Sequence, residues 1–412
     1  MPPSADLRAA VDAAVAAADP AAAVRGVLST EAGRVRIGGE PLTTGEGRVF
    51  VIGAGKAAMP MSAGTAAVCG SQIARGVVVG THAGEAGPIR ILAGSHPVPS
   101  VESVRATQAV REVCAAAGAD DHVLCLLSGG ASALLTAPAA PLTLDDLRAT
   151  TEALLTAGLP IDQINTVRRH CSAVKGGRLA VACQPAGVTT LAVSDVVGDD
   201  PAAIGSGPTV ADPTTFADAA AVIEDAGVSV PAPVRDHLRA GAAGTRPETP
   251  QEVPNSSYHV IAAGETAVDA AAAHLRAAGW PTRVGPTDLA GDAASIAGRL
   301  AGLVDDAPLA IVAGGEATVA HDGTGTGGPT QEVALRVADR LEAGWVAAVD
   351  TDGRDGSTDA AGALVPAGPL DAAMHEALAA HDVYDALAAR EWHIHTGPTG
   401  TNVNDLYLMA VS

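Results

Sequence analysis

Three acidic residues stand close together in the middle of the chain, directly after an apolar run. Asp195, Asp199 and Asp200 follow a run that ends at Val193, in a segment rich in Gly, Ser and Pro. The run predicts a buried strand of an α/β sheet, and ligands of such sheets bind beyond the carboxyl ends of the strands. Carboxylates this close repel one another unless a cation shares the site, so Mg²⁺ with substrate phosphates is one interpretation. The alternative is a solvated acidic loop in which Asp195 caps a helix.

Lysine is rare enough in this chain to be informative where it occurs. The sequence contains only Lys56 and Lys175. Lys56 lies in the turn 53–58, between an apolar run and a helical pattern, and strand, glycine turn and helix form a common phosphate-binding unit. Gly53 and Gly55 also fit the G-x-G-x-x-A pattern of dinucleotide-binding folds, but the next predicted strand lacks the acid that would hold a ribose. Because a lysine in the turn suits phosphate better than a pyridine nucleotide, we favour phosphoryl chemistry over hydride transfer.

A second glycine turn follows the apolar run 123–127. It contains Ser128, Gly129, Gly130 and Ser132, and its glycines do not flank a serine as a nucleophile elbow requires. Backbone amides that bind an anion are the preferred interpretation. Tight packing of the following helix is the alternative.

A basic segment lies at residues 161–180. Helical spacing predicts Arg168 and Lys175 near one face, with Asn165 one turn earlier. On such an acidic protein, a basic face is a candidate site for phosphate or carboxylate. Ordinary surface cations are the alternative.

The second half of the chain also places acids after apolar runs. Glu316 follows the run 309–312, and Asp352 and Asp355 lie in the Asp-rich segment 350–359. This segment lacks the terminal Glu of an EF-hand, so we exclude that Ca²⁺ loop. We interpret it as a Mg²⁺, phosphate or polyol site, with plain Asx-turn structure as the competing interpretation. Before the final apolar run, the hydroxyl and amide side chains that suit a hydroxyl-rich substrate are Thr399, Asn402 and Asn404.

These residues require a scaffold of alternating strands and helices. A chain of 412 residues is too long for one typical core, and 48% hydrophobic content is typical of a compact α/β protein. The Gly-, Pro- and polar-rich segment 241–257 predicts a linker. We therefore expect an N-terminal domain at 1–245 and a C-terminal domain at 246–412.

Charge and cysteine content restrict the partners. With 25 basic and 46 acidic residues the formal net charge is -21, which repels nucleic acid and anionic lipid. The acidic N-terminal segment does not resemble a signal peptide, and five cysteines without metal-ligand spacing predict buried thiols in a reducing cytosol. We expect a cytoplasmic protein that acts on small molecules and binds neither nucleic acid nor membrane.

Taken together, the motifs resemble the glycerate 2-kinase family, which combines a large N-terminal domain with a smaller domain called MOFRL. The likeness runs from Phe50 to Leu408 and includes GAGKAA, SGGASALL, SDVVGDDPAAIGSGPTVADPTTF, GGEATV, TDGRDGSTDAAGA and GPTGTNVNDL. The resemblance implies an α/β fold with a Rossmann-like α/β/α large domain, a smaller α/β domain and an active site in the interdomain cleft. It also implies ATP- and Mg²⁺-dependent phosphorylation of D-glycerate at its 2-hydroxyl.

Other functions stay open beside this one. Members of the family are also labelled hydroxypyruvate reductase, so NAD(P)H-dependent reduction is one alternative, and phosphorylation of another small sugar acid is a second. A non-catalytic sensor of sugar acids is a third, although no output domain is present.

The family's turn lysine corresponds to Lys56. In a phosphoryl transfer we expect Lys56 and Arg168 to meet the transferred phosphate and the substrate carboxylate, and Asp195 or Asp352 to lie near the attacking hydroxyl. Mg²⁺ is expected at Asp199, Asp200 and Asp355, with Asp352 and Glu316 as further candidates. Residues expected to bind substrate or nucleotide are Gly53, Gly55, Ser128, Gly129, Gly130, Ser132, Asn165, Lys175, Glu316, Thr399, Asn402 and Asn404.

One position departs from the family pattern. Where the family reads G-G-R-N-Q-E, this chain has Pro329 in place of the Arg, and Pro carries no charge. Either Arg168, Arg169, Arg354 or Lys175 supplies the positive charge, or the substrate is another hydroxyacid. For the assembly state we allow for a homodimer.

Overall fold

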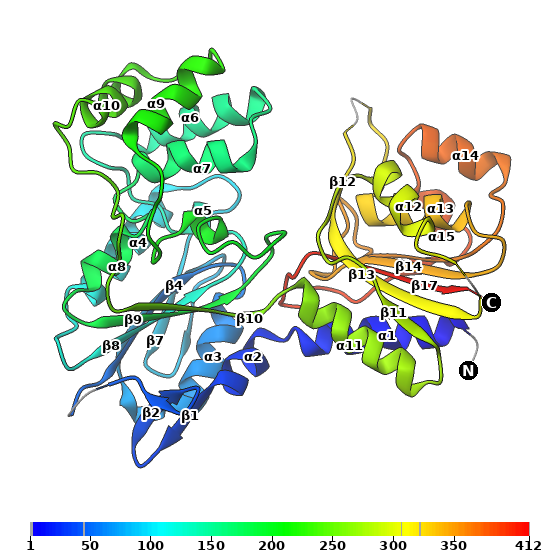
Figure 1. The fold of residues 1–412 in the computed structure, drawn as a ribbon, viewed down its shortest axis with the longest axis horizontal. Coiled ribbons are helices and arrows are strands. Elements are labelled where there is room, and N and C mark those ends of the chain that lie inside the picture. Colours follow the sequence, from blue (N-terminus) through cyan, green and yellow to red (C-terminus); the bar gives the residue numbers. More distant parts are fainter. Residues whose placement is uncertain (1–2, 44–45, 306, 321–322, 412) are drawn as a thin grey trace. The chain divides into compact units, whose positions relative to one another are not determined.

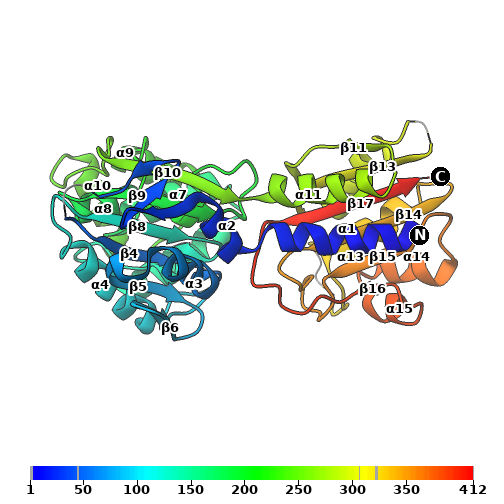
Figure 2. The same ribbon diagram turned by 90° about the horizontal axis from the view of Figure 1, so that it is seen from below.

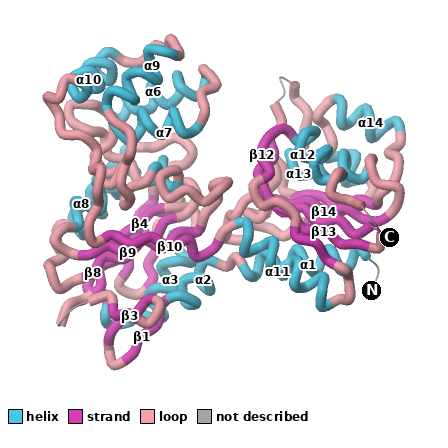
Figure 3. The backbone as a smooth tube through the Cα atoms, viewed as in Figure 1, coloured by secondary structure: helices cyan, strands magenta, loops and turns pink. Residues whose placement is uncertain are grey.

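The structure is a computed structural model that describes residues 3–43, 46–305, 307–320 and 323–411. The chain divides into two compact units. The large unit comprises residues 20–193 and 199–261, and the small unit comprises residues 1–19, 194–198 and 262–412. Both units combine one main β-sheet with helices, as the tube in Figure 3 shows.

A mostly parallel sheet forms the centre of the large unit (Figure 1). Its strand order is β10-β9-β8-β4-β5-β7-β6, and the pairs β4/β5, β4/β8, β5/β7 and β8/β9 are parallel. This is the order of a Rossmann sheet, in which the chain reverses direction across the sheet between β4 and β8. The strands are β4 (Val49–Ala54), β5 (Ile73–Gly80), β6 (Gly84–Ala86), β7 (Ile89–Ala93), β8 (His122–Leu127), β9 (Gly187–Val193) and β10 (Ser256–Ala262).

Helices cover this sheet because each crossover between parallel strands is helical. The crossover from β4 to β5 and the crossover from β7 to β8 run in opposite directions, so right-handed connections place α3 and α4 on opposite faces. Several helices begin at a capping box, for example α4 at Ser100, α6 at Thr143 and α9 at Thr215. The helices are α2 (Pro20–Val27), α3 (Ala58–Cys69), α4 (Val101–Cys114), α5 (Ala131–Leu134), α6 (Leu144–Thr156), α7 (Ile161–His170), α8 (Arg178–Cys183), α9 (Phe216–Asp225) and α10 (Ala232–Ala242).

Four of these helices form a layer of their own. Figure 1 shows α6, α7, α9 and α10 grouped together, beyond the strand ends that carry the glycine turns. Buried residues from all four helices, including Leu154, Val167, Phe216 and Leu238, form a separate apolar core. The unit also carries a three-stranded antiparallel sheet of β1 (Leu28–Glu31), β2 (Arg34–Ile37) and β3 (Glu40–Pro41).

The small unit contains a mixed sheet with strand order β11-β13-β17-β14-β15-β16, to which β12 adds beside β13. Helices α1 and α11 lie side by side on one face (Figure 2), and α12 and α13 pack together against β13, β14 and β15. The strands are β11 (Thr282–Val284), β12 (Leu289–Asp292), β13 (Leu309–Thr318), β14 (Gly344–Asp350), β15 (Gly362–Pro366), β16 (His393–Ile394) and β17 (Asp405–Val411). The helices are α1 (Pro3–Ala17), α11 (Gly264–Ala277), α12 (Ala293–Ala301), α13 (Pro329–Ala338), α14 (Ala372–Ala379) and α15 (Tyr384–Ala388).

The α/β class predicted from the sequence is confirmed, and the large unit has a mostly parallel sheet, but the chain divides differently. The predicted domains were 1–245 and 246–412, whereas β10 extends the large sheet beyond the predicted linker. Helix α1 belongs to the small unit because Leu7, Val11 and Ala14 are buried where α1 packs on α11 and β14. All five cysteines are free and buried, as expected.

Candidate functional site

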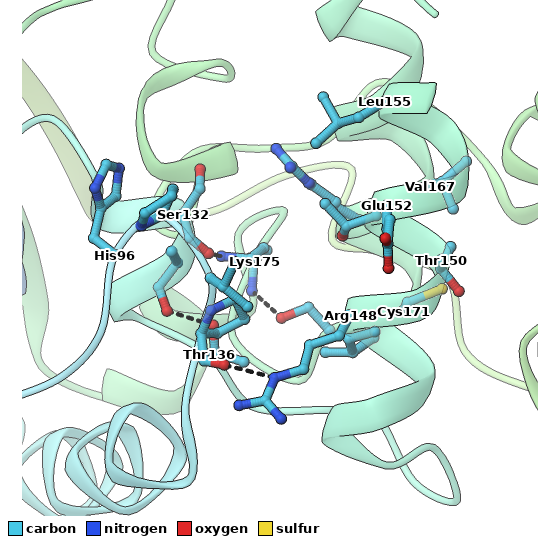
Figure 4. Close-up of a pocket in the computed structure, with 18 of the residues that line it drawn as sticks. His96, Ser132, Thr136, Arg148, Thr150, Glu152, Leu155, Val167, Cys171 and Lys175 are labelled. Carbon is cyan, nitrogen blue, oxygen red and sulfur yellow. Dashed lines mark hydrogen bonds between the residues drawn. The ribbon is translucent and has the colours of Figure 1, made fainter. Parts of the chain in front are cut away.

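A cavity of about 630 Å³ opens in the large unit between the segment 96–99, the start of α5, and helices α6 and α7 (Figure 4). Proteins enclose small organic ligands in cavities of about 300–1,000 Å³. We call this cavity the α6–α7 pocket. Most of the ionisable side chains that line it are basic, and Glu152 is the one acidic residue in its lining. Its lining groups that can carry positive charge are His96, Arg148, Arg168 and Lys175.

Lys175 is held rigidly in the pocket. Its Nζ donates hydrogen bonds to the carbonyl oxygens of Ser132 at 2.8 Å and Leu135 at 3.0 Å, and its side chain is buried. Burial, and secondly the charge of Arg168, lower the pKa of Lys175 to about 7. A negatively charged ligand would favour the protonated form of this amine.

Arg168 contributes a second cation to the same pocket. Burial lowers the pKa of its guanidinium, which nevertheless stays protonated in proteins. Within the described part of the chain, the side chain of Arg168 makes no hydrogen bond and no ion pair. The adjacent Arg169 behaves differently, because its Nε lies 3.2 Å from the buried carboxylate of Asp212. Arg169 is therefore a structural residue and Arg168 is the one available to a ligand.

The imidazole of His96 packs against Gly130 at the edge of the pocket. A Cβ at residue 130 would lie 2.9 Å from the ring, and the φ of Gly130 is +82°, so both the contact and the backbone require glycine. Burial, followed by the charge of Lys56, lowers the pKa of His96, which keeps the ring neutral at pH 7. The sequence did not separate this histidine from an ordinary turn residue.

Three polar side chains connect the pocket to the 3₁₀ turn Ile204–Ser206. The hydroxyls of Ser132 and Ser206 lie 3.0 Å apart, and Ser206 donates to Oδ1 of Asn165 at 3.1 Å. Ser132 and Asn165 were both predicted as site residues, and the structure places them in one hydrogen-bonded chain. The link through Ser206 could not be read from the sequence.

The two glycine turns pack on each other at the carboxyl ends of β4 and β8. The amide of Gly55 donates to Val79, that of Lys56 to Gly129, and that of Ala57 to Oγ of Ser128. A Cβ at Gly53 would lie 2.0 Å from the carbonyl oxygen of residue 126, and a Cβ at Gly55 would lie 1.9 Å from the hydroxyl of residue 128. The amides of the first turn are therefore already bonded, which argues against the predicted phosphate cradle there.

The second turn retains donors. Among the described residues, the amides of Gly129, Gly130 and Ser132 find no hydrogen-bond acceptor. Gly130 and Ser132 line the α6–α7 pocket. The anion-binding interpretation thus fits the turn 128–132 better than the turn 53–58. Lys56, within the first turn, has an exposed side chain.

Sequence reasoning missed the contribution of α6. Arg148 on this helix donates from Nε to the carbonyl oxygen of Pro99 at 2.8 Å and also pairs with Asp145 at 3.2 Å. Thr150, Thr151, Glu152 and Leu155 of the same helix line the pocket (Figure 4). In the sequence α6 is an amphipathic helix with no chemical motif, so only its packing over the segment 96–99 identifies it.

The small unit gathers carboxyl groups at one edge of its sheet. Asp350 at the end of β14 faces Asp405 at the start of β17, and Glu316 follows the residue paired with Asp405 on β13. Burial, then the charge of Asp352, raises the pKa of Asp350 to about 8. Burial, then Glu316 and Asp350, also raises the pKa of Asp405. The Asp350 carboxyl therefore holds a proton at neutral pH that an isolated carboxylate would lose, and Asp405 loses its proton at a higher pH than an isolated carboxyl does.

Asp355 has a structural role. Its carboxylate accepts hydrogen bonds from the amides of Thr330 at 3.1 Å and Gln331 at 2.9 Å, and from Nε2 of Gln331 at 3.0 Å. It therefore satisfies the start of α13, where Pro329 occupies the first helical position and needs no amide partner. These oxygens serve the start of the helix, and the role of Asp355 as a metal ligand stays a prediction.

The remaining predicted residues lie in separate settings. Asp195 belongs to the small unit. In its hydrogen-bonded orientation, the side-chain amide nitrogen of Asn404 donates to the backbone carbonyl oxygen of Asp195 at 2.5 Å and to the carboxylate of Glu316 at 3.3 Å. The Oδ1 of Asn402 accepts the amide of Asn404 at 3.1 Å, and the hydroxyl of Thr399 donates to Thr351 at 2.6 Å. These two contacts order the loop before β17.

Asp199 and Asp200 belong to the large unit, whereas Asp355 belongs to the small unit. Asp200 accepts the amide of Ala202 at 2.9 Å in an Asx turn. Within the described ranges, no three or more His, Cys, Asp or Glu side chains are placed to hold a metal ion. A metal-binding role for Asp199 and Asp200 stays a prediction.

Comparisons with known proteins place these features in context. Residues 6–239 match the domain described as "Domain of unknown function (DUF4147)", and residues 309–405 match the "MOFRL family". A protein of Agrobacterium vitis named "Putative hydroxypyruvate reductase" is 42% identical over 97% of this chain and 92% of its own length. The "Glycerate 2-kinase" of Pyrococcus horikoshii is 37% identical over 98% of this chain and 96% of its own. The crystal structure of glycerate kinase from Thermotoga maritima superposes with a TM-score of 0.86 at 32% identity and covers 99% of both chains. No helix in the described residues has the length and apolar character needed to cross a bilayer.

Proposed function

Because this chain belongs to the glycerate kinase family, which the DUF4147 and MOFRL domains define, we propose that it transfers a phosphoryl group from ATP to the 2-hydroxyl of D-glycerate. One structural observation supports this activity above the others. On a protein of net charge -21, the α6–α7 pocket gathers Arg168 and Lys175 with no acidic partner for Arg168 among the described residues. Both substrates of a glycerate kinase are anions.

Phosphoryl transfer requires positioning and charge neutralisation more than covalent chemistry by the protein. In the proposal, Arg168 and Lys175 bind negative oxygens inside the pocket, and the free amides of the turn 128–132 add donors. Lys56, exposed in the first glycine turn and close enough to affect the pKa of His96, meets the transferred phosphate. Asp195 or Asp352 orients the attacking hydroxyl and accepts its proton.

Mg²⁺ is proposed to arrive bound to the nucleotide. Such complexes need only one or two protein carboxylates besides the phosphate oxygens, so the lack of a larger carboxylate group in the described residues fits this role. Asp199, Asp200, Asp352 and Glu316 remain the candidate ligands. The metal neutralises the charge that develops on the phosphate oxygens.

Reduction of hydroxypyruvate is the alternative that the name of one relative suggests. A dinucleotide pyrophosphate would need the amides of the turn 53–58, and those of Gly55, Lys56 and Ala57 already bond to protein acceptors. Strand β5 also ends in Gly80 rather than in an acid that could hold a ribose. The kinase is therefore favoured.

Purified protein with ATP, Mg²⁺ and a panel of small hydroxyacids tests the proposal, with the phosphate position of the product read by NMR. Formation of 2-phosphoglycerate is expected. Phosphorylation of another acid instead would favour the alternative substrate that the departure at Pro329 leaves open. Oxidation of NADH by hydroxypyruvate without ATP, and no phosphorylated product, would favour the reductase. An active site in an interdomain cleft, a homodimer and a cytoplasmic location stay predictions.

A further inference from the structure

We propose that the α6–α7 pocket is the nucleotide site, with the phosphates at Arg168 and Lys175 and the nucleoside against the apolar rim formed by Val98 and Leu155. This inference rests on the proposed function in taking ATP as the phosphoryl donor. It goes further by assigning the donor, rather than the acid, to this cavity.

The size of the pocket favours a large ligand. A cavity of about 630 Å³ suits a ligand the size of a drug or a nucleotide. A three-carbon acid would fill only a small part of it and would leave the apolar wall exposed to water. A nucleotide would cover that wall.

The pocket has two chemically different ends. Lys175 and Ser172 are buried within it, whereas Val98 and Leu155 are 59% and 56% exposed. Two large aliphatic side chains from different elements, exposed at the mouth of one cavity, form an apolar surface that a ligand can bury. A nucleotide has a matching anionic end and a largely apolar base, while glycerate is polar throughout.

The charged end lacks a protein partner. Arg168 is partly buried and makes no hydrogen bond or ion pair in the described part of the chain, although the sequence contains 46 acidic residues. Lys175 uses two of its three possible donors on Ser132 and Leu135. A partly buried guanidinium without a counter-charge is costly, and phosphate oxygens would compensate it.

Substitutions at the rim test the assignment without touching the charged end. Leu155→Glu places a charge on the apolar wall, and Ile161→Glu makes the same change at an equally exposed residue (59%) of α7 that does not line the pocket. Dissociation constants for ATP and for uncharged adenosine, and KM values for ATP and the hydroxyacid, are measured on both variants of the full chain. Val98→Glu, on a different element, repeats the test should Leu155→Glu fold poorly.

The expected result is about a tenfold loss of affinity for ATP and for adenosine in Leu155→Glu, with an equal rise in KM for ATP and little change for the acid. Ile161→Glu should match the wild type. Unchanged nucleotide binding in both rim variants, or a rise confined to KM for the acid, would overturn the assignment and leave the kinase proposal intact. Rim-sensitive binding of ATP by a protein that phosphorylates no hydroxyacid would support the site and refute the proposed function.

Discussion

The most informative single group in this protein is the amine of Lys175, because its protonation should report directly on whether an anion occupies the pocket. Burial and Arg168 lower its pKa from 10.5 to about 7. The groups that face it are Arg168 on α7, Arg148 and Glu152 on α6, and His96 beside α5. Of these groups, Arg148 and Arg168 are cationic and His96 is neutral at pH 7, and the charge of Arg168 opposes protonation of Lys175.

The expected magnitude follows from this shift. At pH 8, only ~10% of an amine with a pKa of about 7 is protonated, whereas ~99% would be at the ordinary value. A polyphosphate beside Arg168 and Lys175 should return the pKa toward its ordinary value. Binding at pH 8 should therefore take up ~0.9 proton, and binding at about pH 6 only ~0.1. The affinity for ATP should then fall nearly tenfold per pH unit above pH 8, because binding requires Lys175 to take up a proton from solution.

The chain offers an unusually clean assay, because it contains only two lysines. Lysine labelled with carbon-13 at Cε gives two side-chain NMR signals, and the Lys56→Arg variant identifies which one belongs to Lys175. The Lys175 signal is followed against pH without ligand and with saturating ATP. Calorimetry in two buffers of different ionisation enthalpy counts the protons independently, with Lys175→Met as the variant that should take up none at this site.

A Lys175 signal that titrates near pH 10 without ligand would refute the assignment of a desolvated amine. A low pKa that ATP leaves unchanged would show that the anion binds elsewhere. Arg168→Gln provides an intermediate case: removing the neighbouring charge should raise the pKa of Lys175 in the free protein and reduce proton uptake at pH 8.

Three further predictions concern other parts of the molecule. Lys56→Ala should lower kcat by about a hundredfold or more. The melting temperature should stay unchanged because the side chain is exposed. Unchanged turnover would remove Lys56 from the mechanism. Gly55→Ala places a Cβ 1.9 Å from a neighbouring hydroxyl, so it should lower the unfolding free energy measured in urea by at least ~3 kcal/mol. The control Gly33→Ala, at a positive φ in open space, should lower it by about 1 kcal/mol. Equal losses would contradict the packing role of Gly55. Asp350 has a folded-state pKa raised from 3.8 to about 8, so its contribution to the unfolding free energy declines as pH rises from about 4 to about 8. Asp350→Asn should therefore show a shallower decline than the wild type over the same pH range. The exposed control Asp288→Asn should follow the wild type, and parallel curves for all three proteins would show that the carboxyl is not desolvated.

The sequence was informative about which residues matter in the large unit but less so about how they meet. Arg168 and Lys175 were predicted to share the face of one continuous helix over residues 161–180. The structure ends α7 at His170 and starts α8 at Arg178, and left-handed Gly176 and Gly177 make the connection. The two cations nevertheless line one pocket, because the connecting turn brings Lys175 back toward α7. The spacing in the sequence therefore identified the pair of cations, but the conformations of the two glycines determine the turn that positions it.

The glycine turns show a different limit of sequence reasoning. A strand, a glycine pair and a helix look alike whether the amides face a ligand or face another turn. Only the hydrogen-bond partners of Lys56 and Ala57 reveal that residues of the second turn already accept the amides of the first turn. The pairing of Asp350 with Asp405 is likewise set by the antiparallel register of β14 and β17, which joins residues far apart in the chain.

Arg168 and Arg169 are adjacent in sequence and identical in type, yet the fold treats them in opposite ways. Arg169 is satisfied by the buried carboxylate of Asp212, whereas Arg168 points its unpaired charge at a cavity. A protein with 46 acidic residues could readily supply one more partner. Leaving Arg168 unpaired costs stability that a partner inside the chain would recover, and a ligand recovers it only when bound. Phosphate, pyrophosphate or ATP should therefore raise the melting temperature of the wild type in a concentration-dependent way. Arg168→Gln should lose most of that gain, whereas Arg235→Gln, which changes an exposed arginine outside the pocket, should keep it. Equal stabilisation of both variants would mean that the anion is recognised elsewhere on the molecule.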